Sequence, residues 1–419
     1  MYKEFNINNK IIELSEKARE ELIPIFRDID KNSMFCSGKV LKAFQEERVD
    51  TSDFNEITGY GYSHSGRDKL ERVFARVFKA EDALVRPQIM SGTHALTLCL
   101  TGLLRHGDTF ISISGEPYDS LRTVIGIDGD IETSLINNGI KYEQIDLIDD
   151  DFDYDKIIER MSRNDVRLIE IQRSVGYSNR KSICISKIEK VIKKIREVNN
   201  NVIILVDNCY GEFVEDREPI EVGADVIASS FMKNLGAGIA TSGGYIVGSS
   251  KCINLIADRL TVPGVGKNLG VDLGTLLSYY KGLFFSPSVV ASALKTMVFA
   301  SYMLEKLGYK VSPKYNEKRT DIIEVVELGN EKDLIEFCQG LQKGGPIESN
   351  VIPIPSPMPG YPFDEIMAGA SFTPSATIEL SADGPITPPY KAFMQGSLTY
   401  EYGKLGIMIA LSNLTSEKE

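Results

Sequence analysis

The feature that most constrains the fold is a short apolar run ending on a carboxylate, VIILVD at positions 202–207. A run of about six residues rich in Val, Ile and Leu is typical of a strand buried on both faces of a sheet. Comparable short runs alternate along the chain with segments of helical periodicity. This alternation favours crossover connections and a mostly parallel sheet. We therefore predict an α/β fold.

The same patterns predict individual elements and a division of the chain. We expect helices at 11–29, 69–78, 95–104, 132–138, 154–161, 188–198, 289–306 and 331–343. We expect strands at 83–86, 110–114, 142–147, 166–172, 202–207, 244–247, 322–327 and 377–380. These give an N-terminal helical segment (1–55), a large domain (56–286) and a smaller α+β domain (287–419). The proline-rich stretch 352–363 cannot be helical, and is either a linker or a stiff loop over a pocket.

Charge and composition limit the classes of partner. The net charge is -12 and the pI is about 5.0, which argues against nucleic acid or anionic lipid as the main partner. We find no continuous apolar stretch of about eighteen residues and expect no membrane span. The charged N-terminus lacks an apolar signal core, and the six scattered cysteines are typical of reduced thiols, so we expect a cytoplasmic protein. The three histidines lack metal-ligand spacing, so we expect no metal site.

Two polar residues at the end of the central stretch indicate a cofactor. Asp207 closes the predicted strand, Lys233 follows in the glycine-rich and largely uncharged segment SSFMKNLGAG, and Ser230 precedes that lysine by three positions. Pyridoxal phosphate needs a lysine as covalent anchor and a carboxylate that keeps its pyridine nitrogen protonated. Asp207 could instead close a loop as an Asx turn, and Lys233 could be a surface lysine.

A second pair of features would complete such a site. Ser91, Gly92 and Thr93 form a turn before a buried helix, whose free N–H groups suit a phosphate. Tyr118 follows the next strand and could stack on the cofactor ring. The plain alternatives are an N-cap by Ser91 or Thr93, and ordinary packing by Tyr118. GVGKN lacks the residues of a P-loop, and GAGIAT lacks the third glycine of a dinucleotide fingerprint.

Longer segments add a resemblance to a known family. SGTHAL, EPYDSL, VDNCYGEF and SSFMKN, in this order, resemble fold-type I pyridoxal-phosphate enzymes of the cystathionine and methionine lyase branch. QRSVGYSNR, MKNLGAGIATSGGYIVG, GLFFSPSVV, IPSPMPGY and IELSADGP are similar to the methionine γ-lyase-related family of aluminium resistance proteins. The resemblance extends from about residue 54 to residue 414.

The resemblance implies a fold-type I transferase fold with a seven-stranded type of sheet, and specific roles for the residues named above. Lys233 would bind pyridoxal phosphate covalently and move protons, and Asp207 would bind the pyridinium nitrogen. The phosphate would be held by Ser230 together with the turn at 91–93. Tyr118 would stack on the ring and assist the leaving group, which makes Lys233 and Tyr118 the catalytic residues.

Further expectations concern the neighbouring subunit and the substrate. In the lyase branch a tyrosine and an arginine from a neighbouring subunit reach the phosphate, which would be Tyr60 or Tyr62, with Arg67 as the candidate arginine. We thus expect a homo-oligomer, either a dimer or a dimer of dimers (a homotetramer). The branch also holds the substrate carboxylate with a C-terminal arginine. This chain has none after Arg319, so Arg173 or Lys404 could substitute, or the site could be neutral.

The implied function is a lyase acting on a small amino acid. We expect β- or γ-elimination that breaks a carbon–sulfur bond of a sulfur-containing substrate. Retro-aldol cleavage and transamination are alternatives on the same cofactor. A non-catalytic pyridoxal-binding protein with a regulatory role is the alternative from another class.

Overall fold

The computed structural model describes residues 1–178, 180–358 and 363–415. The chain forms two compact units, a large unit of Cys36–Phe284 and a small unit of Met1–Phe35 with Phe285–Glu419. The sequence predicts the second boundary near residue 286 and a separate segment of residues 1–55. The structure instead groups the first 35 residues with the C-terminal part.

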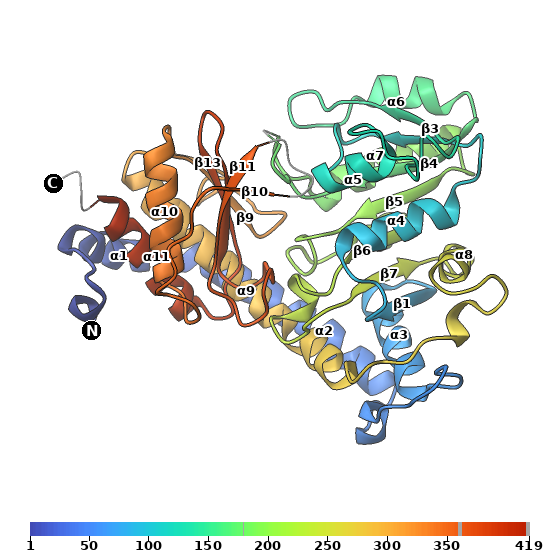
Figure 1. The fold of residues 1–419 in the computed structure, drawn as a ribbon, viewed down its shortest axis with the longest axis horizontal. Coiled ribbons are helices and arrows are strands. Elements are labelled where there is room, and N and C mark those ends of the chain that lie inside the picture. The colour runs from blue at the N-terminus through green and yellow to red at the C-terminus, as the bar shows by residue number, and fades with distance from the viewer. Residues whose placement is uncertain (179, 359–362, 416–419) are drawn as a thin grey trace. The chain divides into compact units, whose positions relative to one another are not determined.

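The large unit is built on a seven-stranded sheet with the order β1-β7-β6-β5-β4-β2-β3 (Figure 1). Its strands are β1 Asp82–Arg86, β2 Thr109–Ser112, β3 Lys141–Gln144, β4 Val166–Gln172, β5 Ile203–Asp207, β6 Val226–Ser230 and β7 Gly244–Gly248. Strands β3, β2, β4, β5 and β6 pair in parallel. Strand β7 is antiparallel to both of its neighbours, so β1 runs in the same direction as the parallel strands.

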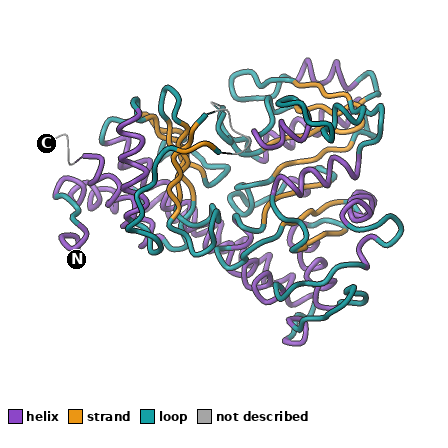
Figure 2. Tube along the Cα trace, viewed as in Figure 1, coloured by secondary structure: helices purple, strands orange, loops and turns teal. Residues whose placement is uncertain are grey.

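Strand β5 is buried on both faces of the sheet, as the apolar run at 202–207 predicts. Ile203 and Leu205 belong to an apolar cluster with the helices α4 and α8, while Ile204 and Val206 point to the other face and are fully buried. Helices and strands alternate in this unit (Figure 2). The helices confined to it are α3 Ser65–Phe78, α4 Gly92–Leu103, α5 Asp119–Ile125, α6 Tyr154–Met161, α7 Ile185–Val198 and α8 Ser250–Leu260.

The small unit contains a six-stranded antiparallel sheet with the order β10-β11-β12-β13-β9-β8. Its strands are β8 Lys310–Ser312, β9 Ile323–Glu327, β10 Ser356–Pro357, β11 Asp364–Gly369, β12 Ser381–Pro385 and β13 Lys391–Gln395. Helices α1 Asn9–Glu21, α10 Glu331–Lys343 and α11 Tyr400–Thr415 lie in this unit. Helices α2 Ile23–Glu46 and α9 Leu276–Lys306 each include residues of both units.

The N-terminal residues belong to the small unit because their apolar side chains complete its core. Ile7, Ile11, Ala18 and Leu22 are buried in one cluster with side chains of α9, α10 and α11. The backbone N–H of Asn8 also donates to a hydroxyl of α11 (3.2 Å). These contacts explain why a segment that reads as separate in the sequence folds with the C-terminal residues.

Three predicted elements were wrong in extent or type. The single helix at 11–29 is two helices that meet at Leu22, with Pro24 in the first turn of α2, where its missing N–H costs little. Residues 132–138 form turns, because Ser134 and Asn138 bond to the local backbone instead. Residues 377–380 precede strand β12 as turns, and the Glu379 carboxylate accepts two backbone N–H groups there.

Helix α9 corrects one further expectation. The helix begins at Leu276 and continues through Pro287, rather than starting at residue 289. It is long and apolar enough to cross a membrane by length and composition, although we expected no such stretch. However, 67% of its most apolar window is buried inside the structure, as in the core helix of a soluble protein.

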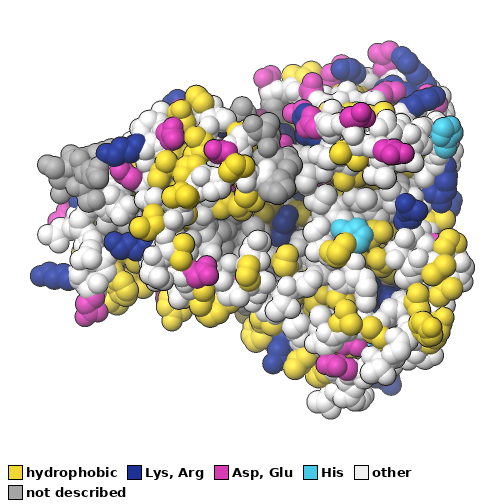
Figure 3. All heavy atoms as spheres, viewed as in Figure 1, with side chains coloured by type: hydrophobic (Ala, Val, Ile, Leu, Met, Phe, Trp, Pro, Cys, Tyr) yellow, Lys and Arg dark blue, Asp and Glu magenta, His cyan; other side chains and the backbone are white. Residues whose placement is uncertain are grey.

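On the face drawn in Figure 3, acidic and basic side chains are interspersed around the region of α6.

Candidate active site

The candidate site lies at one edge of the large sheet. Because β1, β2, β4, β5 and β6 run in the same direction, the loops that follow them meet at their carboxyl ends, where open α/β sheets bind ligands. Asp207 ends β5 and is in register with Gln172 at the end of β4. Ser230 ends β6, and the loop to Lys233 follows it. The topology therefore brings most of the predicted site residues to one edge.

Asp207 is buried, with 7% of its surface exposed. Its Oδ1 accepts a hydrogen bond from the backbone N–H of Cys209 (3.0 Å), so the Asx turn proposed as the plain alternative does form. The turn uses one carboxylate oxygen and fixes the orientation of the other. The Asp207 carboxylate also raises the pKa of the Lys233 amine, which shows that the two charges share one environment.

Lys233 is half-buried at the start of the short 3₁₀ turn η4 Asn234–Gly236. Its Nζ lies 4.1 Å from the centroid of the Tyr210 ring. Burial opposes its charge, but the Cys209 thiol, the Tyr210 phenol and the Asp207 carboxylate together raise the pKa of Lys233 above its ordinary value. Lys233 is therefore an enclosed amine among partners that attract its proton, and the surface-lysine alternative is wrong.

The turn at 91–93 faces the end of β6. A Cβ atom on Gly92 would lie 3.3 Å from Cys209 Sγ and 3.4 Å from the backbone nitrogen of Ser230. The turn therefore packs closely against Cys209 and the end of β6. Ser91 caps helix α4 by accepting the N–H of His94 (3.0 Å), and the Thr93 hydroxyl contacts that of Ser120 (2.7 Å). The N-cap reading is thus correct, and it leaves the first N–H groups of α4 beside Ser230.

Tyr118 lies on the other side of Gln172. It is half-buried immediately before α5, and its ring is 6.2 Å from that of Tyr177 at an interplanar angle of 50°. A Cβ on Gly176 would lie 3.1 Å from Gln172 Nε2 and 3.3 Å from Tyr118 Cδ2, so these side chains enclose the loop after β4. Gln172 Oε1 is buried without a hydrogen-bond partner among the described residues. An unpaired buried amide oxygen at this edge suits a ligand that donates a hydrogen bond.

The Tyr60–Tyr62 segment is exposed but held in place. Tyr60 and Tyr62 are 75% and 56% exposed, and their rings lie 6.0 Å apart. Gly61 between them has φ +74°, and a Cβ there would lie 2.4 Å from the carbonyl oxygen of Gly270. The backbone N–H of Gly270 donates to the Tyr60 carbonyl (2.9 Å). The two tyrosines are therefore presented outward on a fixed loop.

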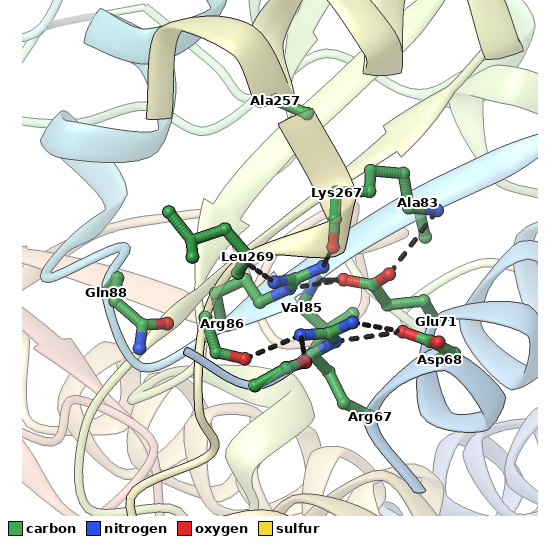
Figure 4. A network of polar contacts seen from close by, with 12 residues as sticks. Arg67, Asp68, Glu71, Ala83, Val85, Arg86, Gln88, Ala257, Lys267 and Leu269 are labelled. Carbon is green, nitrogen blue, oxygen red and sulfur yellow. Dashed lines mark hydrogen bonds and ion pairs between the residues drawn. The ribbon is translucent and has the colours of Figure 1, made fainter. Parts of the chain in front are cut away.

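Two buried arginines hold this loop (Figure 4). Arg67 donates through Nη1 to the carbonyls of Gly61 (2.8 Å) and Gly270 (2.6 Å), and through Nε and Nη2 to the Asp68 carboxylate. Arg86 donates to Glu71 Oε1 (2.6 Å) and to the Leu269 carbonyl (2.8 Å). Arg67 is thus used to fasten the tyrosine loop in its own chain, which corrects its assignment as a candidate phosphate ligand.

Comparisons with known proteins place this geometry in a family. The model of the methionine gamma-lyase family matches residues 11–415. The chain belongs to the methionine gamma-lyase family. YnbB of Bacillus subtilis is 44% identical over 404 residues, which cover 96% of each chain. A solved structure from Clostridium novyi, named a carbon-sulfur lyase involved in aluminum resistance, is 43% identical with a TM-score of 0.94, covering 98% of this chain and 97% of that one.

Two more distant solved structures support the fold alone. The methionine gamma lyase CalE6 of Micromonospora echinospora is 17% identical with a TM-score of 0.55, covering 84% of this chain and 87% of its own. The pyridoxal-5'-phosphate dependent protein YhfS of Escherichia coli is 18% identical with a TM-score of 0.61, covering 93% and 97%. The predicted family and the fold-type I architecture are therefore confirmed, with a mostly parallel seven-stranded sheet.

Arg173 and Lys404, the two residues suggested to bind the substrate carboxylate, have different surroundings. Arg173 is fully buried, and it donates to Asn208 Oδ1, the Gly211 carbonyl and Glu215 Oε2 at 2.8–2.9 Å. These partners leave it unavailable to a substrate, so this assignment is corrected. Lys404 belongs to the small unit, where its Nζ lies 5.5 Å from the Phe299 ring and burial lowers its pKa.

Two site residues could not be recognised from the sequence. Gln172 is the last residue of a predicted strand, and Cys209 is one of six scattered thiols. The signal for Gln172 is its place at the carboxyl end of a predicted strand beside Asp207. Cys209 stands two residues after Asp207, in the loop that the strand end places at the site.

Proposed function

We propose that the protein is a pyridoxal-phosphate-dependent carbon–sulfur lyase that acts on a small sulfur-containing amino acid. The observation that carries the proposal is the arrangement of Lys233, Asp207 and the turn at Gly92 along one sheet edge, in a chain of this family. The names of the relatives agree with this reading, since they include a carbon-sulfur lyase and a methionine gamma lyase.

The residues present fit this cofactor on three counts. The close approach of Gly92 to Ser230 brings the N–H groups of the α4 N-terminus and a hydroxyl together, a donor set for phosphate. Asp207 offers a carboxylate whose second oxygen is not used by the Asx turn, suited to a pyridinium N–H. Lys233 provides an enclosed primary amine near that carboxylate. Tyr118 would lie against the ring, and Gln172 offers an unpaired acceptor.

When bound, pyridoxal phosphate supplies an electron-withdrawing ring that makes the substrate Cα–H acidic. With the cofactor bound, Lys233 Nζ would accept the Cα proton and return protons later. Asp207 would bind the protonated pyridine nitrogen by a charge-assisted hydrogen bond that contributes roughly 1.5–3 kcal/mol. The Tyr118 hydroxyl would donate a proton to the departing sulfur, which would otherwise leave as a thiolate.

A substrate panel tests the reaction. Purified protein with pyridoxal phosphate is incubated with cystathionine, methionine, cysteine and threonine, and thiol, ammonia, ketoacid and aldehyde are measured. We expect thiol, ammonia and ketoacid in equal amounts from a sulfur substrate, and none from Lys233→Ala. Aldehyde and glycine from threonine would instead indicate retro-aldol cleavage. Ketoacid without thiol release would indicate transamination. A spectral change without any product would favour a regulatory pyridoxal-binding protein.

Assembly and location are part of the same proposal. We propose a homo-oligomer, a dimer or a dimer of dimers, because the exposed and fixed Tyr60–Tyr62 loop is suited to reach a neighbouring subunit's phosphate site. We also propose a cytoplasmic location, in keeping with six free cysteines. Sedimentation of the active enzyme tests the first, since a fully active monomer would contradict it. Fractionation of the source cells tests the second.

A further inference from the structure

The turn at 91–93 is closed by a histidine that the proposed function does not use. The backbone N–H of Met90 donates to His94 Nδ1 (3.1 Å), and the backbone N–H of His94 donates to Ser91 Oγ (3.0 Å). His94 is the third residue of α4, and Ser91 is the N-cap of that helix. The two hydrogen bonds therefore cross the turn in opposite directions, as in a capping box, where a side chain of the first helical turn accepts an N–H from the residues before it.

The hydrogen bond from Met90 determines the form of the half-buried His94 ring. A ring nitrogen that accepts an N–H carries no proton, so the neutral imidazole carries its proton on Nε2. Burial lowers the pKa of His94 below its ordinary value, which favours this neutral form. A protonated ring would donate from both nitrogens and could not accept the Met90 N–H. His94 therefore acts here as a neutral acceptor.

Other contacts fix the chain on both sides of Met90. Ile89, which precedes it, is fully buried. On the helix side, the Thr93 hydroxyl contacts that of Ser120 (2.7 Å). Met90 lies between these positions and is 67% exposed, with its N–H bound by His94. Loss of the histidine would thus release the exposed residue at the entrance of the turn.

The closed turn also decides which N–H groups remain for a ligand. The N–H of His94 is used by the Ser91 hydroxyl. Those of Gly92 and Thr93 come first in the helix, where the helix offers no acceptor of its own. Gly92 lies against the end of β6, because a Cβ there would be 3.4 Å from the Ser230 nitrogen. Two N–H groups beside Ser230 are therefore available to a phosphate.

A neutral acceptor suits this position better than the glutamate of an ordinary capping box. A carboxylate in the first turn of α4 would repel a phosphate group, which carries roughly two negative charges near neutral pH. Histidine accepts the same kind of N–H without adding negative charge. The residue type at position 94 is therefore compatible with both closing the turn and binding an anion there.

We propose that His94 is a positioning residue for the phosphate turn, which it closes by accepting the Met90 N–H as a neutral imidazole. The proposal rests on the proposed function, because it concerns the phosphate of the cofactor assigned to this site. His94 acts through the backbone of the turn and is assigned no contact with substrate. Its loss should weaken binding of the phosphate group while leaving the reaction of Lys233 with an aldehyde nearly unchanged.

The experiment compares two ligands that differ only in the phosphate. Full-length protein freed of cofactor is titrated with pyridoxal phosphate and with pyridoxal at about pH 8, where histidine is neutral, and absorbance is followed. His94→Leu removes the acceptor. We expect it to raise the dissociation constant of pyridoxal phosphate about threefold to tenfold, and that of pyridoxal less than about twofold. His94→Gln keeps a neutral acceptor and should bind both ligands as the wild type does. His106→Gln is the matched control, an exposed histidine outside the turn, and should change neither constant.

Equal weakening of both ligands by His94→Leu would indicate a general structural effect and overturn the proposal. Unchanged binding of both ligands, or a His94→Gln variant as weak as His94→Leu, would also overturn it. If His94→Leu does not fold, His94→Glu serves instead, because it keeps an acceptor and adds a charge. It should unfold at nearly the wild-type temperature but bind pyridoxal phosphate at least about tenfold more weakly, with pyridoxal little affected. Wild-type affinity for pyridoxal phosphate in this variant would overturn the proposal.

A measurement without ligand keeps the two hypotheses distinct. Nitrogen NMR of protein with isotope-labelled histidines reports which ring nitrogen carries the proton, and His94→Gln identifies the His94 signals. We expect the proton on Nε2 and an unprotonated, hydrogen-bonded Nδ1. A proton on Nδ1 would overturn the role of His94. If the wild type binds neither ligand, the proposed function fails, whereas the NMR result decides independently whether His94 closes the turn.

Discussion

Replacing Gly92 by alanine tests the phosphate turn with the smallest possible change. The added methyl would lie 3.3 Å from Cys209 Sγ, and 3.4 Å and 3.5 Å from the nitrogen and Cβ of Ser230. The contact with Cys209 Sγ is tighter than most side chains make, whereas the two contacts with Ser230 are ordinary van der Waals contacts. The Cys209 side chain or the turn must therefore shift by a few tenths of an ångström, and we expect this shift to displace the N–H groups of the turn from the phosphate.

Two opposing effects determine how much Gly92→Ala changes the free energy of unfolding. Gly92 opens helix α4 with a backbone that other residues adopt, and alanine in a helix is favoured over glycine by roughly 0.5–1 kcal/mol. The tight contact with Cys209 offsets about this much, so we expect the free energy of unfolding to change by less than about 1 kcal/mol. Displacing donors from a bound group can cost far more, and we expect the cofactor dissociation constant to rise by about tenfold or more, equal to about 1.4 kcal/mol.

The assay is a titration of cofactor-free protein with pyridoxal phosphate, followed by absorbance, alongside thermal unfolding without cofactor. Gly38→Ala is the matched control, a glycine inside helix α2 with no atom within 4 Å of the added Cβ. It should stabilise the fold slightly and leave cofactor affinity unchanged. If Gly92→Ala binds the cofactor as tightly as the wild type, the turn is not the phosphate site.

The other predictions concern buried charges and the substrate. Burial alone would raise the pKa of Glu71, yet Arg86 and Lys267 hold this pKa below its usual value. The Glu71 carboxylate therefore stabilises the folded protein above about pH 4.3, and this contribution is lost as the pH falls through the folded pKa. Glu71→Gln should cost about 3–5 kcal/mol in urea unfolding at pH 7, and a cost below about 1 kcal/mol would contradict this. Burial raises the pKa of Glu170 to about 8, so the folded state binds the extra proton and stability should fall as pH rises from about 4.3 to 8. Glu170→Gln should remove that slope, and a slope that persists would refute the assignment. If Lys404 binds the substrate carboxylate, Lys404→Met should raise KM about tenfold with kcat nearly unchanged, and an unchanged KM would favour a neutral carboxylate site.

The strands of the large sheet could be predicted because each is indicated by residues that are adjacent in the sequence. The segments 166–172 and 202–207 are rich in Val, Ile and Leu and are short, which favours buried strands, and the helix between them favours a parallel crossover. The turns at 132–138 and 377–380 could not be predicted, because their side chains bond to backbone groups that only the fold brings near. Helix α9 continues through Pro287 because its apolar residues are buried, and packing outweighs the local helix-breaking tendency.

The candidate site shows the same division. Asp207, Ser230 and Lys233 could be chosen from the sequence because they follow strand ends at short distances. Arg67 and Arg173 could not be judged that way, because an arginine pattern does not reveal which carbonyls and carboxylates will surround the guanidinium. In both cases the fold supplies backbone carbonyls and a carboxylate that accept hydrogen bonds from the guanidinium.

Reductive trapping tests the central claim most directly. Protein incubated with pyridoxal phosphate is treated with borohydride, which makes a cofactor–lysine linkage permanent, and the labelled peptide is identified by mass spectrometry. The account predicts one phosphopyridoxyl group, on Lys233, and none in Lys233→Ala. A label confined to another lysine, or no stoichiometric label in the wild type, would contradict it.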